Sequence, residues 1–108
     1  MRIIDSNILI YSYSDAHKYL RPLLLESDVR VSEITRLEVL GFHGLGQEEE
    51  MFLEIQAIEI NRIIMDEAIR LRKAYKMKLG DSIIAATAVL NGLELYTRNV
   101  ADFEQIPD

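Results

Sequence analysis

The 108-residue sequence contains no cysteine and only two histidines, His17 and His43. The absence of cysteine excludes disulfides and thiolate metal sites, and it is compatible with a reducing cytoplasm. A zinc site of the usual histidine and cysteine composition is therefore disfavoured. Any bound metal ion would have to be held mostly by oxygen ligands.

Proline, glycine and long hydrophobic runs are also scarce. Two prolines and five glycines are too few for a disordered or collagen-like chain. No linker is visible, so residues 1–108 are expected to form a single domain with its own core. No apolar stretch reaches the length of a membrane span, and Asp5 interrupts the apolar run that a secretory signal would need. We expect a soluble, cytoplasmic protein with no membrane partner.

Basic residues are outnumbered, with 12 Lys and Arg against 18 Asp and Glu and a formal net charge of −6. This balance argues against a nucleic-acid partner, unless several of the carboxylates bind divalent cations that neutralise them. One segment concentrates positive charge. Its residues are candidates for phosphate contacts, with a solvated basic face as the alternative: Arg70, Arg72, Lys73, Lys76 and Lys78.

Apolar runs and helical patterns alternate along the chain. Four short runs are predicted strands: Arg2–Ile4, Val29–Val31, Ala57–Ile60 and Leu93–Thr97. Helical patterns lie between them: 14–27 with a break at Pro22, a Ser32-capped helix through Leu40, 47–55, 66–77, and 81–91. The alternation predicts an α/β fold in which helices flank a parallel sheet of four strands, or five.

Four acidic residues lie where predicted strands end or on the helices between them. Asp5 follows the first strand, Asp102 lies in the turn after the last, and Glu38 and Asp81 lie on helices. Because parallel strands bring their carboxyl ends to one edge of a sheet, we expect these acids to meet there. Alternative roles are a turn residue for Asp5 or Asp102, a solvated surface residue for Glu38, and a helix N-cap for Asp81.

Converging carboxylates repel one another unless a cation neutralises them. Ligation by oxygen alone indicates Mg²⁺ or Mn²⁺, and such sites suit phosphodiester hydrolysis. Read alone, Asp81 fits an N-cap better than a metal ligand. The other three acids reverse that preference, although a carboxylate at a helix start can serve both roles because the helix dipole favours its charged form.

Aromatic side chains gather early in the chain. Tyr11, Tyr13, His17 and Tyr19 lie close together in the sequence. Two surface roles are open to them, stacking on nucleic-acid bases and contact with a partner protein. Aromatic residues of amphipathic segments more often pack in or beside the core, so we expect packing here.

Three motifs occur in a characteristic order: Asp5-Ser6-Asn7 after the first strand; Ile34-Thr35-Arg36-Leu37-Glu38 on a helix; and the run from Asp81 to Ala88, followed by the Thr97 to Phe103 turn. In this order and spacing, the chain from Met1 to about Phe103 resembles a PIN-domain ribonuclease of the VapC toxin type. Compared with most members, the segment between Asn7 and Val29 is short. Members also often continue past the position of Asp108 into a fifth strand.

The resemblance implies a Mg²⁺- or Mn²⁺-dependent endoribonuclease that acts on RNA, is inhibited by a cognate antitoxin protein and is usually a homodimer. Matched position by position, it implies metal-binding and catalytic roles for Asp5, Glu38 and Asp81, with Asp102 as a less uniform fourth acid. It also implies that three polar residues support the site: Asn7, Thr97 and Asn99.

Two other readings are open. A PIN-like module that binds RNA or protein without cleaving would keep the same fold, and the intact acids count against it. A haloacid-dehalogenase-like phosphatase starting from Asp5 would need a second Asp two residues later, where this sequence has Asn7.

Overall fold

The computed structural model describes residues 1–12, 15–24, 26–41 and 55–97. Its strands are β1 (Arg2–Ile4), β2 (Val29–Ser32), β3 (Gln56–Ile58) and β4 (Glu94–Tyr96). Its helices are α1 (Ser6–Ser12), the 3-10 helix η1 (Asp15–Leu20), α2 (Arg21–Leu24), α3 (Glu33–Leu40), α5 (Arg62–Tyr75) and α6 (Leu79–Asn91). The helix predicted at 47–55 lies outside the described residues, apart from Ile55 at its end.

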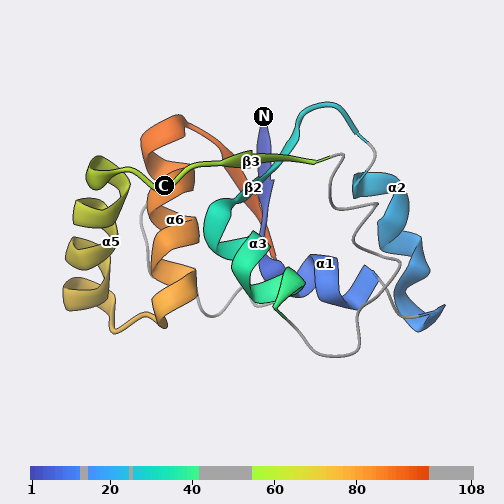
Figure 1. Ribbon diagram of the computed structural model, residues 1–108, viewed down its shortest axis with the longest axis horizontal. Helices are drawn as coiled ribbons and strands as arrows, with labels where there is room; N and C mark the ends of the chain where they lie inside the picture. The colour runs from blue at the N-terminus through green and yellow to red at the C-terminus, as the bar shows by residue number, and fades with distance from the viewer. Residues whose placement is uncertain (13–14, 25, 42–54, 98–108) are drawn as a thin grey trace.

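The described strands form one sheet in the order β3-β2-β1-β4, and every neighbouring pair is parallel. In Figure 1, α5 and α6 lie on one side of the sheet, while α1 and α2 lie on the other. This arrangement confirms the predicted α/β class and the parallel four-stranded sheet.

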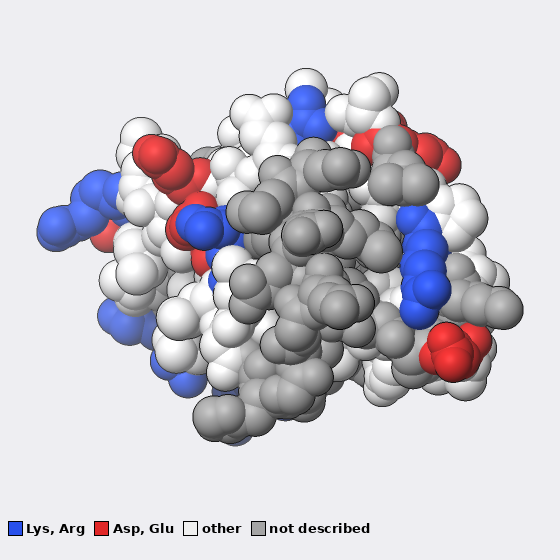
Figure 2. Space-filling model, turned by 45° about the vertical axis from the view of Figure 1, so that its right-hand side comes forward, with Lys and Arg blue, Asp and Glu red and all other residues white. Residues whose placement is uncertain are grey.

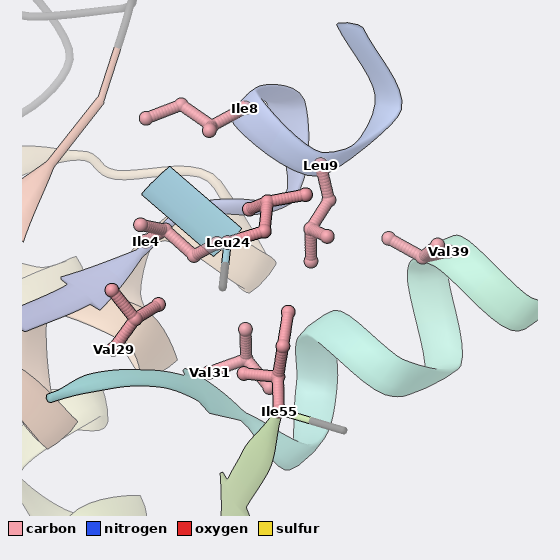
Figure 3. Packing of buried hydrophobic residues seen from close by; sticks show 8 residues of the cluster. All are labelled: Ile4, Ile8, Leu9, Leu24, Val29, Val31, Val39 and Ile55. Carbon is pink, nitrogen blue, oxygen red and sulfur yellow. The ribbon is translucent and has the colours of Figure 1, made fainter. Parts of the chain in front are cut away.

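Strand β1 lies in the interior of the sheet and is covered on both faces. Ile3 and Ile4 are fully buried, and adjacent residues of a strand point to opposite faces. Ile4 packs with Leu9 and Val31 in the cluster beside α1 (Figure 3). Ile3 packs against Ile84 on α6. Both faces of a parallel sheet are normally covered in this way. The carboxyl end of β1 therefore lies between helices on the two faces of the sheet.

The guanidinium of Arg2 links β1 to the turn before β2 and to β4. Its Nε donates to Asp28 Oδ2 at 3.1 Å, and it also pairs with Glu26. The guanidinium lies 5.2 Å from the centre of the Tyr96 ring. Hydrogen bonding from Arg2 holds the pKa of the Asp28 carboxyl below its usual range. The start of β1 is therefore linked both to the turn before β2 and to β4.

Helix α6 is the most deeply buried of the described helices. Every residue from Ser82 to Ala88 is buried, and Ala85 and Ala86 pack with residues of α5. The alanines of this stretch predict that the helix can lie close against a neighbour, and their small side chains do let α5 and α6 pack closely. No described helix, including the thirteen-residue α6, is long and apolar enough to cross a membrane.

Two local expectations are wrong. Helix α5 begins at Arg62, four residues before the predicted start at Asp66, because Asn61 caps it. In α3, the three-residue spacing of Ile34, Leu37 and Leu40 predicts that Leu37 lies on the buried stripe, but Leu37 is 69% exposed. Thr35 and Val39 are the buried pair instead, since residues four apart lie on one face of a helix.

The Asn61 cap of α5 should make a measurable contribution to the free energy of unfolding. Its side-chain oxygen accepts a hydrogen bond from the Ile64 backbone N–H at 2.8 Å. Replacing Asn61 by Ala should lower the free energy of unfolding by about 1 kcal/mol, because that N–H loses its partner. Urea denaturation measures the change. Asn61→Asp is the matched control and should keep the cap; equal loss in both variants would contradict the assignment.

Candidate active site

The ends of β1 and β4 lie at the point where the strand order reverses. The chain runs outward from β1 through β2 to β3 and then returns to the other side of β1 as β4. Open α/β sheets bind ligands beyond the carboxyl ends of strands at such a reversal. Here Asp5 and Thr97 directly follow the two strands, and the Asp5 backbone N–H donates to the Tyr96 carbonyl at 3.2 Å.

The Asp5 carboxylate is 2% exposed and is held from two directions. Its Oδ1 accepts from the Ile8 backbone N–H at 3.2 Å, at the start of α1. Its Oδ2 accepts from the Thr97 hydroxyl. The two predicted site residues are 92 positions apart, so this contact depends on the pairing of β1 with β4. A buried carboxylate in a fixed orientation is suited to binding a cation.

The Glu38 carboxylate is held by the residue that follows Asp5. Ser6 Oγ donates to Glu38 Oε1 at 2.7 Å and lies 3.2 Å from Thr35 Oγ1. Ser6 is buried, whereas Glu38 is exposed on α3. Ser6 was not among the predicted site residues. Its position inside the Asp5-Ser6-Asn7 motif is the sequence feature that could have identified it.

Gly80 is a second residue that the sequence reasoning missed. A Cβ at this position would lie 3.1 and 3.2 Å from the two carboxylate oxygens of Glu38 and 3.3 Å from its Cδ. These distances are tighter than ordinary van der Waals contact. Only a residue without a side chain leaves the Glu38 carboxylate this close to the start of α6, where Asp81 follows.

Asp81 lies in the first turn of α6 and is half-buried. The N-cap position belongs to Lys78, whose side chain makes no capping hydrogen bond. Asp81 as the N-cap is therefore wrong, because the helix begins two residues earlier than the sequence pattern suggested. The dipole of α6 still favours the charged form of a carboxylate in its first turn.

Three contacts join the ends of β1 and β4 to α3 and α6. Thr97 binds Asp5, Ser6 binds Glu38, and the Glu38 carboxylate lies beside Gly80. Asn7 lies half-buried on α1, while Asn99 and Asp102 fall outside the described residues.

Within the described ranges, no group of three or more Asp, Glu or His side chains could hold a metal ion. The meeting of Asp5, Glu38 and Asp81 at one ion therefore stays a prediction. Repulsion between carboxylates opposes such a meeting when no cation is bound.

All five residues of the basic segment are exposed, and its two arginines are hydrogen-bonded to other residues. Arg70 donates to Glu67 at 3.0 and 3.1 Å and holds the pKa of the Glu67 carboxyl below its usual range. Arg72 Nε donates to the Met77 carbonyl at 3.2 Å. Lys76 and Lys78 are exposed in the turn between α5 and α6. The charges nearest in sequence to Asp81 are thus on the surface.

A family model for the PIN domain matches residues 2–108. The chain is similar to a chain of a toxin-antitoxin complex from Klebsiella pneumoniae, with 36% identity, a TM-score of 0.80, and coverage of 99% of this chain and 93% of that one. It is also similar in fold to a chain of VapBC2 from Rickettsia felis bound to a DNA fragment from their promoter, with 21% identity, a TM-score of 0.73, and 98% and 92% coverage. Comparison with curated protein sequences gave no match.

The chain belongs to the PIN-domain family. The resemblance to VapC-type toxins, which the three sequence motifs predicted, is confirmed by the family match and the similar toxin-antitoxin structures. The acid at the end of β1 and its contact with Thr97 therefore belong to a fold shared with toxins of this kind.

Proposed function

We propose that this chain is a Mg²⁺- or Mn²⁺-dependent endoribonuclease and the toxin of a toxin-antitoxin pair. The observation that carries the proposal is the buried Asp5 carboxylate at the strand-order reversal, oriented by Thr97 and the start of α1. Family membership and the similar toxin-antitoxin structure support the nuclease class. RNA as the substrate rests on the resemblance of the sequence motifs.

The chemistry of the candidate ligands suits a hard divalent cation, because the donors are all oxygen atoms, although in the described residues no three of these side chains are grouped around one position. Asp5, Glu38 and Asp81 would hold the ion, with Asp102 as a fourth acid. The space left by the missing Cβ of Gly80 supports this fit, since it admits the Glu38 carboxylate to the start of α6. When bound, the cation would supply charge stabilisation and a nucleophilic water for phosphodiester hydrolysis.

The side chains around these acids serve to orient them. The Thr97 hydroxyl and the Ile8 N–H each engage one oxygen of Asp5, so the carboxylate cannot turn freely. Ser6 does the same for one oxygen of Glu38. Groups that orient metal ligands are commonly worth 10- to 100-fold in metal affinity or activity. We assign Thr97 and Ser6 this supporting role, together with Asn7 and Asn99.

The proposed partners are an antitoxin protein and a second copy of the chain. The proposed location of the protein is the cytoplasm. The structure from Klebsiella pneumoniae is a toxin-antitoxin complex, and its matching chain is covered over 93% of its length. That likeness supports an antitoxin for this chain. The homodimer rests on the resemblance to the family.

Incubation of the purified chain, free of antitoxin, with cellular RNA tests the proposed activity. We expect cleavage with millimolar Mg²⁺ or Mn²⁺, loss of cleavage in EDTA and recovery when metal is restored. The metal should also raise the melting temperature, because a ligand that binds only the folded state stabilises it. RNA binding without cleavage under either metal would instead favour the non-cleaving PIN-like module.

A further inference from the structure

Tyr11 and Tyr19, which were expected to pack in or beside the core, are both partly exposed. Tyr19 is 64% exposed and Tyr11 is 40% exposed, while His17 is half-buried between them in the sequence. Tyr13 lies outside the described residues. The expectation of packing holds for Tyr11, which is more than half buried beside His17, and is wrong for Tyr19, whose side chain is available to a ligand.

Tyr11, His17 and Tyr19 form one group, the aromatic triad. The ring centres of Tyr11 and His17 are 5.0 Å apart with a 42° angle between the planes. Those of His17 and Tyr19 are 6.0 Å apart at 44°. Both distances lie within the range of attractive aromatic pairs. His17 thus contacts both tyrosine rings and restricts their movement, which lowers the entropy lost when a ligand binds them.

The triad is close to the proposed active site. Helix α1 begins at Ser6, next to Asp5, and Tyr11 lies five residues later, a rise of about 7.5 Å along the helix. Helix η1, which carries the other two rings, packs against α1. Figure 1 shows α1 running from the end of β1 toward η1 and α2. A single strand that enters the site can therefore reach the rings with nearby nucleotides.

The described charges on this side of the molecule are mixed in sign, so RNA bound here would be held mainly through its bases and less through its phosphates. Among the residues coloured in Figure 2, Lys and Arg are interspersed with Asp and Glu and form no continuous basic surface. Beside the triad, Arg21 lies 3.9 Å from the Asp15 carboxylate and donates to the Ser12 carbonyl at 2.8 Å. Sites for single-stranded nucleic acid combine charge contacts to the backbone with aromatic stacking, and the stacking is sequence-tolerant because every base has a π-face.

From these observations we infer that the aromatic triad is a binding platform for single-stranded RNA, on which bases next to the cleaved bond stack. The inference rests on the proposed ribonuclease function. It adds a site for bases to a centre otherwise built from carboxylates and hydroxyls. Tyr19, the most exposed ring of the triad, should contribute most to stacking.

Binding of a short single-stranded RNA, labelled with an adenine analogue whose emission is quenched by stacking, tests the platform. Full-length protein is used in EDTA, so that no cleavage occurs. We expect Tyr19→Ala to raise the dissociation constant about 5- to 140-fold, the range for loss of one base–aromatic stack. Tyr19→Phe should bind and quench like the unchanged protein, because the π-face remains.

Two further variants separate stacking from other causes. Tyr19→Leu keeps apolar bulk without a π-face, so it should bind as weakly as Tyr19→Ala. Ile63→Ala removes a side chain of similar exposure, 67%, on α5, and should leave binding unchanged. Unchanged RNA binding by Tyr19→Ala, or full binding by Tyr19→Leu, would overturn the platform.

The same variants distinguish the platform from the proposed function and from a protein interface. If the unchanged protein cleaves RNA with metal while Tyr19→Ala binds and cleaves equally well, the platform is wrong and the ribonuclease stands. If no RNA is cleaved with metal but the triad variants still lose binding, the ribonuclease is wrong, and stacking of single-stranded RNA on the triad stands without its place beside a cleaved bond. Loss of antitoxin inhibition with unchanged RNA binding would assign the triad to a protein partner and overturn the inference.

Discussion

Asp5→Asn should reduce metal-dependent RNA cleavage at least about 100-fold while the protein stays folded. The metal is worth several kcal/mol to such a reaction, and each 1.36 kcal/mol changes the rate tenfold. Asn is a poorer ligand because it is uncharged. It can still accept from the Ile8 N–H through its oxygen and donate to the Thr97 hydroxyl through its nitrogen, so the two contacts that now hold Asp5 have substitutes.

Single-turnover cleavage rates with Mg²⁺ and Mn²⁺ measure this effect, and circular dichroism checks the fold. Asp66→Asn is the matched control. It removes the same charge from an exposed position on α5, whose side chain is 65% accessible, and should leave the rate unchanged. The metal-induced rise in melting temperature should shrink in Asp5→Asn alone. Cleavage by Asp5→Asn at the rate of the unchanged protein would remove Asp5 from the active site.

Gly80→Ala should lower cleavage about 3- to 10-fold, although Gly80 carries no chemical group. The new Cβ would lie 3.1 Å from Glu38 Oε1, so the carboxylate must shift by a few tenths of an ångström from the start of α6. A displacement of about 1 Å in an active site can cost 100-fold in rate, and this smaller shift should cost correspondingly less. The fold should survive, because Ala is a better helix residue than Gly by up to about 1 kcal/mol.

A double-mutant cycle with Glu38→Ala isolates the contact between the two residues. With the Glu38 carboxylate removed, Gly80→Ala has nothing to displace. It should then raise the free energy of unfolding and cause no further loss of cleavage. Equal effects of Gly80→Ala in both backgrounds would show that the glycine acts through something other than Glu38.

Misplaced sequence expectations share a cause. The start of α6 was taken to be Asp81 because acids often cap helices, yet the helix begins at Leu79 and leaves Asp81 in its first turn. Leu37 was placed on the buried stripe of α3 by its spacing alone. Periodicity shows that a helix has an apolar face, but neighbouring elements decide which residues are covered. The exposure of Tyr19 has the same origin.

By itself, the sequence determined the alternation of strands and helices, and with it a parallel sheet that has Asp5 at the end of its first strand. These features follow from local patterns of apolar residues and from the geometry of parallel crossovers. The motifs also identified the family correctly.

Only the tertiary structure decided that β4 pairs with β1, and that Thr97 therefore binds Asp5 across 92 positions. It alone showed Glu38 between Ser6 and Gly80, and the aromatic triad on the surface. Strand order and helix packing depend on contacts between distant segments. The spacing of residues within one segment does not predict those contacts, because the segment can form the same helix or strand in several different tertiary arrangements.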